Sequence, residues 1–120
     1  MCESTPEYHL SKEQAKLLVE RTVAIIGDKW SLLIIGALSF GKSSSRFNEL
    51  MRELNPISSR TLSSKLAKLS ENGMIQKTFE SASPPYTRYS LTEKGIDLVF
   101  AFRAMADWSL KWQNQASNGT

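Results

Sequence analysis

The sequence contains only one cysteine and one histidine, Cys2 and His9, among its 120 residues. No disulfide can therefore form within the chain, and a single thiol is typical of a protein in a reducing, cytoplasmic setting. Zinc-type metal sites need several cysteine or histidine ligands, and a Ser-His or Cys-His nucleophile needs a histidine held in a structured setting. Both residues instead lie near the N-terminus, in a segment without periodicity. The sequence therefore predicts no cofactor, no metal site and no enzymatic activity.

Long hydrophobic runs are also absent. The longest, LLIIGAL from Leu32 to Leu38, is far shorter than the roughly 20 residues that cross a bilayer. The polar, acidic start MCESTPEYHL does not resemble a secretory signal peptide. Internal repeats, low-complexity tracts and linkers are missing as well. With 41% hydrophobic residues in so short a chain, we expect one soluble cytoplasmic domain that has no membrane partner.

Charge is present but unevenly distributed. The net charge is +3, and residues 42–94 hold nine basic and five acidic residues, a net +4, against −1 for residues 1–41 and 0 for residues 95–120. An anionic partner should therefore meet the middle of the chain.

Local patterns predict the first three helices. Ser11 and Gln14 have the spacing of a capping box, which favours a helix over 11–26. DKWSLLIIGALSFG indicates a short buried helix that ends near Gly41, and SRFNELMREL indicates a third helix that Pro56 ends.

The second half of the chain predicts a different arrangement. Ser58 can cap a helix over 58–72, and Gly73 is a typical C-terminal stop. The alternating segments MIQKTFES and YTRYSLT flank the turn ASPP and predict a two-stranded hairpin over 75–92. Thr92 can cap a last helix over 93–114.

This order describes a mainly α fold with a small β-hairpin wing, a winged helix-turn-helix, as one domain over 11–116. Flexible segments over 1–10 and 117–120 should flank it.

The helix over 58–72 has two unlike faces. Leu62, Leu66 and Leu69 recur at helical spacing, whereas Arg60 and Ser64 lie roughly opposite Leu62. A small, basic, hydroxylated face suits the major groove, where arginine can bond guanine edges and serines and lysines can hold phosphates. A solvated face with capping hydroxyls is the alternative. The predicted DNA contacts are Ser58, Ser59, Arg60, Thr61, Ser63, Ser64, Lys65 and Lys68 in this helix, and Lys77, Pro85, Tyr86 and Arg88 in the hairpin.

The first and last helices carry the predicted dimer interface. A broad apolar stripe follows the last helix and ends at two tryptophans, which is more apolar surface than a small wing domain can cover. Packing inside one subunit, or a small-molecule pocket between helices, would use the same side chains. The predicted interface residues are Leu17, Leu18, Leu98, Val99, Phe102, Met105, Trp108 and Trp112.

One string matches a phosphate-binding loop literally. GALSFGKS, Gly36 to Ser43, has the spacing of a Walker A motif. We interpret the match as accidental, because the chain offers no βαβ succession and Leu38 and Phe40 look like core residues. Nucleotide binding through this string stays an alternative function.

Together these motifs resemble an HxlR-type winged helix-turn-helix transcriptional regulator. The resemblance runs from about Val19 to Trp112 and rests on IIGDKWSLLII, RFNELMREL, ISSRTLSSKLAKLSENGMI, PPYTRYSLTEKG and the tryptophan-bearing last helix. It implies a sequence-specific DNA-binding homodimer, joined by its first and last helices, whose 58–72 helix reads the major groove with the wing near Pro85 beside it. A winged-helix module that binds acidic proteins is the alternative function.

The sequence departs from this family at one position. Many members sense oxidants with a cysteine that precedes the VER-like segment, and Leu17 stands at that position here. Cys2 lies well upstream, without a basic partner that would lower its pKa. A small-molecule effector of unknown identity is the alternative to oxidation of a cysteine as the signal. The operator, the regulated genes and the direction of control are not encoded in these patterns.

Overall fold

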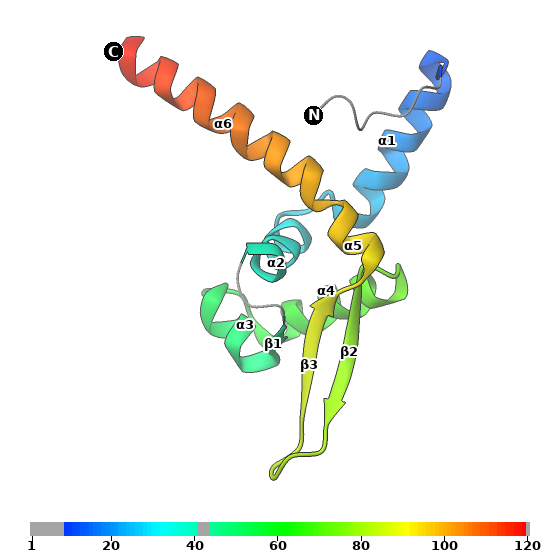
Figure 1. Ribbon diagram of the computed structural model, residues 1–120, viewed down its shortest axis with the longest axis vertical. Coiled ribbons are helices and arrows are strands. Elements are labelled where there is room, and N and C mark those ends of the chain that lie inside the picture. Colours follow the sequence, from blue (N-terminus) through cyan, green and yellow to red (C-terminus); the bar gives the residue numbers. More distant parts are fainter. Residues whose placement is uncertain (1–8, 41–43, 120) are drawn as a thin grey trace.

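A computed structural model describes residues 9–40 and 44–119, with side chains up to residue 113. The fold is mainly helical with a small antiparallel sheet, as predicted (Figure 1). The elements are α1 (Lys12–Ile26), α2 (Lys29–Phe40), β1 (Ser45–Arg46), α3 (Phe47–Glu53), α4 (Ser59–Glu71), β2 (Ile75–Glu80), β3 (Tyr86–Leu91), α5 (Glu93–Asp97) and α6 (Val99–Gly119).

Helix ends follow the local signals of the sequence. The Oγ of Ser11 accepts a hydrogen bond from the Gln14 N–H (3.0 Å), and Gln14 accepts one in return from the Ser11 N–H (2.9 Å), which completes the predicted capping box. Thr92 likewise accepts from the Gly95 N–H (3.1 Å) at the start of α5. Gly73 has φ +73°, the left-handed conformation that commonly ends a helix.

Two elements differ from the sequence prediction. The predicted two-stranded hairpin is part of a three-stranded sheet of order β1-β3-β2, in which Ser45 pairs with Tyr89 and Arg46 with Arg88. A strand of two residues has no period that sequence patterns could reveal.

The predicted helix over 93–114 is two helices, α5 and α6, divided at Leu98. The Leu98 N–H donates to the Gly95 carbonyl (3.1 Å), a tighter turn than that of an α-helix. Helical structure also continues to Gly119, into the segment predicted to be a flexible tail.

The core lies among α2, α3, α4 and the root of the sheet. Ile34 and Ile35 of α2 are fully buried against Leu50 of α3 and the leucines of α4. Leu62 and Leu69 have no accessible surface, so the leucine face of α4 docks on the core as predicted. This packing leaves the opposite face of α4 in solvent.

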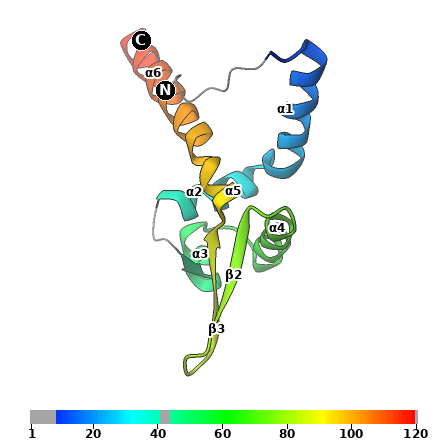
Figure 2. The same cartoon turned by 45° about the vertical axis from the view of Figure 1, so that its right-hand side comes forward.

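Two long helices project from this core. α1 and α6 diverge on the side opposite the wing, as Figures 1 and 2 both show, and α1 buries none of its residues. The radius of gyration is 17.0 Å, against about 13.6 Å for a compact chain of this length. Within the described ranges no single helix is long and apolar enough to cross a membrane. Only α1 and α2 taken as a pair have that length and hydropathy, and they are bent by 80° where they meet.

Candidate nucleic-acid interface

The outer face of α4 is the centre of the candidate interface. α3 and α4 form the helix pair, and α4 turns Ser59, Arg60, Ser63 and Ser64 outward, all of them exposed. Because the leucines fix the opposite face in the core, the roll of the helix about its axis is set by packing. Arg60 therefore projects into solvent from the first turn of α4.

Two predicted contacts take part in the cap of α4. The Oγ of Ser58 accepts from the Thr61 N–H (3.0 Å) and donates to the Oγ1 of Thr61 (2.9 Å). These hydroxyls satisfy the start of the helix, which is the alternative weighed from the sequence.

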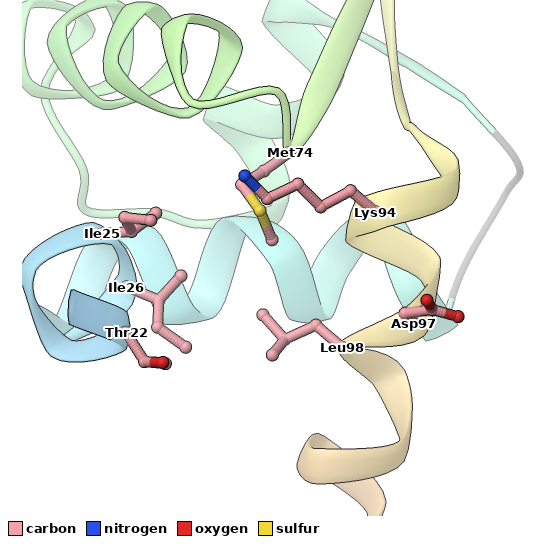
Figure 3. A pocket seen from close by; sticks show the side chains of 7 residues that line it. All are labelled: Thr22, Ile25, Ile26, Met74, Lys94, Asp97 and Leu98. Carbon is pink, nitrogen blue, oxygen red and sulfur yellow. The ribbon is translucent and has the colours of Figure 1, made fainter. Parts of the chain in front are cut away.

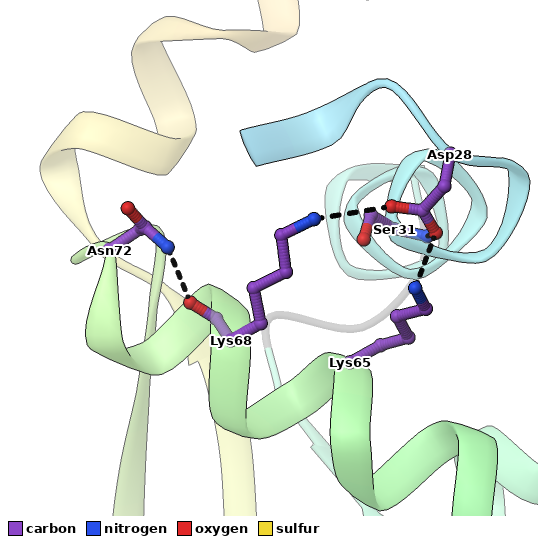
Figure 4. Close-up of polar contacts among 5 residues, drawn as sticks. All are labelled: Asp28, Ser31, Lys65, Lys68 and Asn72. Atoms are coloured by element: carbon purple, nitrogen blue, oxygen red, sulfur yellow. Dashed lines mark hydrogen bonds and ion pairs between the residues drawn. The ribbon is translucent and has the colours of Figure 1, made fainter. Parts of the chain in front are cut away.

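Lys65 and Lys68 are half-buried, and their side chains turn away from the outer face. Their ammonium groups approach the carboxylate of Asp28 in the turn between α1 and α2, at 3.3 Å and 3.5 Å (Figure 4). The prediction of both lysines as direct DNA contacts disagrees with this placement. Helix geometry from the sequence placed Lys68 beside the outer face, but it could not show that Asp28 would attract the ammonium groups of both lysines.

The predicted wing residues are divided between two faces of the sheet. Lys77 pairs with Tyr89, and Thr78 pairs with Arg88, so Lys77 and Arg88 point to opposite sides of the pleat. Pro85 is exposed in the turn between β2 and β3. The guanidinium of Arg88 donates from Nε to the Oγ of Ser44 (2.7 Å), which anchors it to the root of the wing.

Sequence reasoning missed a second group of basic residues beside the wing. The guanidinium of Arg46 stacks on the ring of Tyr86, 3.6 Å from its centroid. Arg46, Asn48, Arg52 and Tyr86 line a groove of about 490 Å³ between the start of α3 and β3. The only sequence signal was the pair of arginines in SRFNELMREL, because the β1–β3 pairing that joins them to Tyr86 is long-range.

The predicted dimer residues fall into two groups. Leu17, Leu18, Met105, Trp108 and Trp112 are exposed large apolar side chains on the projecting helices. Phe102 is only 8% exposed and belongs to the core, and Leu98 packs against that core while Val99 is half-buried. For Phe102 the structure favours packing inside one subunit, the alternative left open from the sequence, because that face of α6 rests on α2, where the ring approaches Gly36.

The phosphate-loop string is not a loop in the described residues. Gly36 to Phe40 form the end of α2, whereas a phosphate-binding loop must follow a strand so that successive N–H groups face the ligand. Gly41, Lys42 and Ser43 lie outside the described residues, and so does Cys2. No cluster of three or more potential metal ligands occurs in the part of the chain that the structure describes.

A cavity of about 230 Å³ lies where the projecting helices meet the core (Figure 3). Ile25 and Ile26 of α1, Met74 after α4, and Leu98 between α5 and α6 form its apolar wall. Its polar side chains are Thr22, Lys94 and Asp97. The volume lies below the roughly 300–1,000 Å³ of common ligand pockets, so a ligand in this cavity would be small.

Comparison with other sequences agrees with this arrangement. A family model described as HxlR-like helix-turn-helix matches residues 25–117. The uncharacterized HTH-type transcriptional regulator BH0655 of Halalkalibacterium halodurans is 36% identical over 93 residues, which cover 78% of this chain and 81% of that protein. YdeP of Bacillus subtilis, another uncharacterized HTH-type transcriptional regulator, is 36% identical over 97 residues, with coverage of 81% and 74%.

Solved structures resemble the chain over most of its length. The redox regulator HypR in its reduced form is 30% identical and superposes with a TM-score of 0.73, covering 83% of this chain and 97% of HypR. A transcriptional regulator assigned to the MarR family, from Enterococcus faecalis V583, reaches a TM-score of 0.78 at 24% identity, with coverage of 94% and 99%. At 24% identity, the likeness to the Enterococcus faecalis structure supports the fold alone.

Proposed function

Because this chain belongs to the HxlR-like helix-turn-helix family and is a DNA-binding transcriptional regulator, we propose that it binds its operator as a homodimer. Each α4 would lie in a major groove, with the wing of the same subunit beside it. The observation that best supports this proposal is that the exposed basic surface and the exposed apolar surface lie on separate elements of the molecule. The wing extends from one side of the core and α1 and α6 project from the other (Figure 1). The exposed face of α4 is polar and basic, whereas α1 and α6 carry exposed apolar side chains.

The dimer part of the proposal follows from uncovered apolar surface. Met105, Trp108 and Trp112 lie within about 60° of one another around α6, and each is at least half exposed. Exposed patches of this kind mark interaction sites. A second copy would cover them with the same residues across a two-fold axis, and such an axis would place two α4 helices on two half-sites.

We assign each predicted DNA contact to a base or to the backbone according to the chemistry of its side chain. Arg60 would make paired hydrogen bonds to a guanine edge, while Ser59, Ser63 and Ser64 would hold phosphates or sugars near it. Lys77 and Arg46 would meet the phosphate backbone from the wing. A DNA partner implies a cytoplasmic location, and this function requires no catalysis by the chain.

Binding to genomic DNA fragments tests the proposal. We expect a specific complex that survives excess competitor DNA and weakens steeply between about 50 and 200 mM salt, because the release of counterions that favours binding becomes less favourable as the salt concentration rises. Gel-shift titrations at several salt concentrations measure both properties. Binding that is absent or indifferent to sequence would instead favour a winged-helix module for acidic proteins.

We also propose that the cavity beside Leu98 receives a small effector. A one-ring anion would place its ring on Ile26 and Leu98 and its charge toward Lys94, whose ammonium already bonds the Asn72 carbonyl (2.9 Å). We expect millimolar benzoate to raise the melting temperature, and Leu98→Trp, which fills the cavity, to abolish that rise. A rise that survives Leu98→Trp would place the site elsewhere.

A further inference from the structure

The carboxylate of Asp28, which lies outside the DNA-facing surface, contacts two of the three basic side chains on α4, Lys65 and Lys68. The Oδ2 of Asp28 accepts the Ser31 N–H (3.0 Å) and lies 3.3 Å from the ammonium of Lys65. Its Oδ1 lies 3.5 Å from the ammonium of Lys68. Figure 4 shows both lysines reaching from α4 toward this carboxylate, while the Asn72 amide, at the end of α4, donates to the Lys68 carbonyl (2.9 Å).

The contact is partly shielded from water. The side chain of Asp28 is 33% exposed, against 27% for Lys65 and 36% for Lys68. The Oδ1 atom itself is inaccessible to solvent and accepts no hydrogen bond from the described residues. Lys68 is therefore the cation that compensates the buried side of the carboxylate, at a distance that makes an ion pair and not a hydrogen bond.

Asp28 stays charged under all conditions in which the protein would meet DNA. Partial burial raises its pKa, but the Ser31 N–H and the Lys65 ammonium outweigh burial and hold the pKa well below its usual range. A lowered pKa in the folded state means that the contribution of these pairs is present at neutral pH and is lost only under strongly acidic conditions.

The placement changes what α4 offers to DNA. Of its three basic residues, Arg60 lies on the outer face, whereas Lys65 and Lys68 are drawn to Asp28. Sequence-independent binding grows with the number of phosphates that lysines and arginines neutralise. Each lysine withheld from phosphate therefore weakens binding to random DNA without removing a base contact.

We propose that Asp28 is a specificity-determining residue that restrains Lys68 and thereby suppresses non-specific DNA binding by the reading helix. The proposal rests on the proposed function, in which the outer face of α4 enters the major groove. Lys68 lies only about 40° around the helix from Ser64, whereas Lys65 lies about 100° away. Without the carboxylate, Lys68 can turn its long side chain to a flanking phosphate, and Lys65 cannot.

Asp28→Asn separates charge from shape. Asparagine keeps the size of the side chain and its capping hydrogen bond to Ser31, but it no longer attracts the lysines. The measurement is the affinity for operator and for random DNA across a salt series, with melting temperature as a check of folding. We expect affinity for random DNA to rise about five-fold at 0.15 M salt, with a salt slope steeper by about one unit. The ratio of operator to random affinity should fall.

Two lysine variants supply the matched controls. In the Asp28→Asn background, Lys68→Gln should return the slope to the wild-type value, and Lys65→Gln should leave the steeper slope in place. In the wild-type background, Lys68→Gln should leave the slope unchanged because Asp28 already occupies Lys68. The measurement on Lys68→Gln alone tests the proposal even when the Asp28→Asn variant does not fold.

The outcomes are distinguishable. A wild-type protein that does not discriminate operator from random DNA would refute the proposed function itself. If wild type discriminates but Asp28→Asn leaves slope and ratio unchanged, or weakens both DNAs equally, Asp28 has only a structural role. A slope that drops by one unit in Lys68→Gln alone would show that Lys68 binds phosphate despite Asp28, which also contradicts the inference.

Discussion

Trp108→Glu should convert the protein from a dimer to a monomer at micromolar concentration. Trp108 is 67% exposed on α6, beside an apolar hollow of about 390 Å³ that Ala104, Met105 and Ser109 complete. In a dimer this surface would be buried, and an unpaired buried charge costs several kcal/mol. We therefore expect the dissociation constant to rise on the order of 10²–10³-fold. Operator affinity should fall with it, because two half-sites lose their link.

Leu110→Glu is the matched control for this change. Leu110 is similarly exposed, at 59%, but lies about 200° around the helix from Trp108. Sedimentation should find Leu110→Glu dimeric and Trp108→Glu monomeric, and circular dichroism should show both variants folded. Phe102 is not suitable for this test, because a charge there would disrupt the core of each subunit. A wild-type protein that sediments as a monomer would remove the dimer from the proposed function.

Arg60→Ala should cost roughly 1–3 kcal/mol at the operator and little on random DNA, because it removes a pair of hydrogen bonds to one base. Lys77→Ala should weaken every sequence about equally and reduce the salt slope by about one unit, because it removes one phosphate contact. Both side chains are exposed, so neither change should disturb the fold.

Affinities of both variants for operator and random DNA, across a salt series, measure this difference. Arg60→Ala should lose discrimination and Lys77→Ala should retain it. If Arg60→Ala weakens both DNAs by the same factor, Arg60 holds phosphate. Base reading would then pass to Ser59, Ser63 or Ser64.

The wing arginines illustrate what could not be predicted. Arg88 was assigned to DNA from its charge, and its position on β3 was predicted. The sequence gives no sign that Ser44, 44 residues earlier, would receive its Nε–H. Arg46 was not assigned at all, because its meeting with Tyr86 depends on a two-residue strand.

The sequence by itself determined the order of the longer helices and of the two strands of the wing, several helix ends and the buried face of α4, but not β1 or the division between α5 and α6. Ser11, Ser58, Thr92 and Gly73 act within a few residues of themselves, and the leucines of α4 repeat with the period of the helix. The tertiary structure alone decided which polar residues remain available to a partner. It brought Asp28 to Lys65 and Lys68 and laid Phe102 on α2. Such contacts join distant segments whose spacing in the chain has no period, so only the packing of the core defines them.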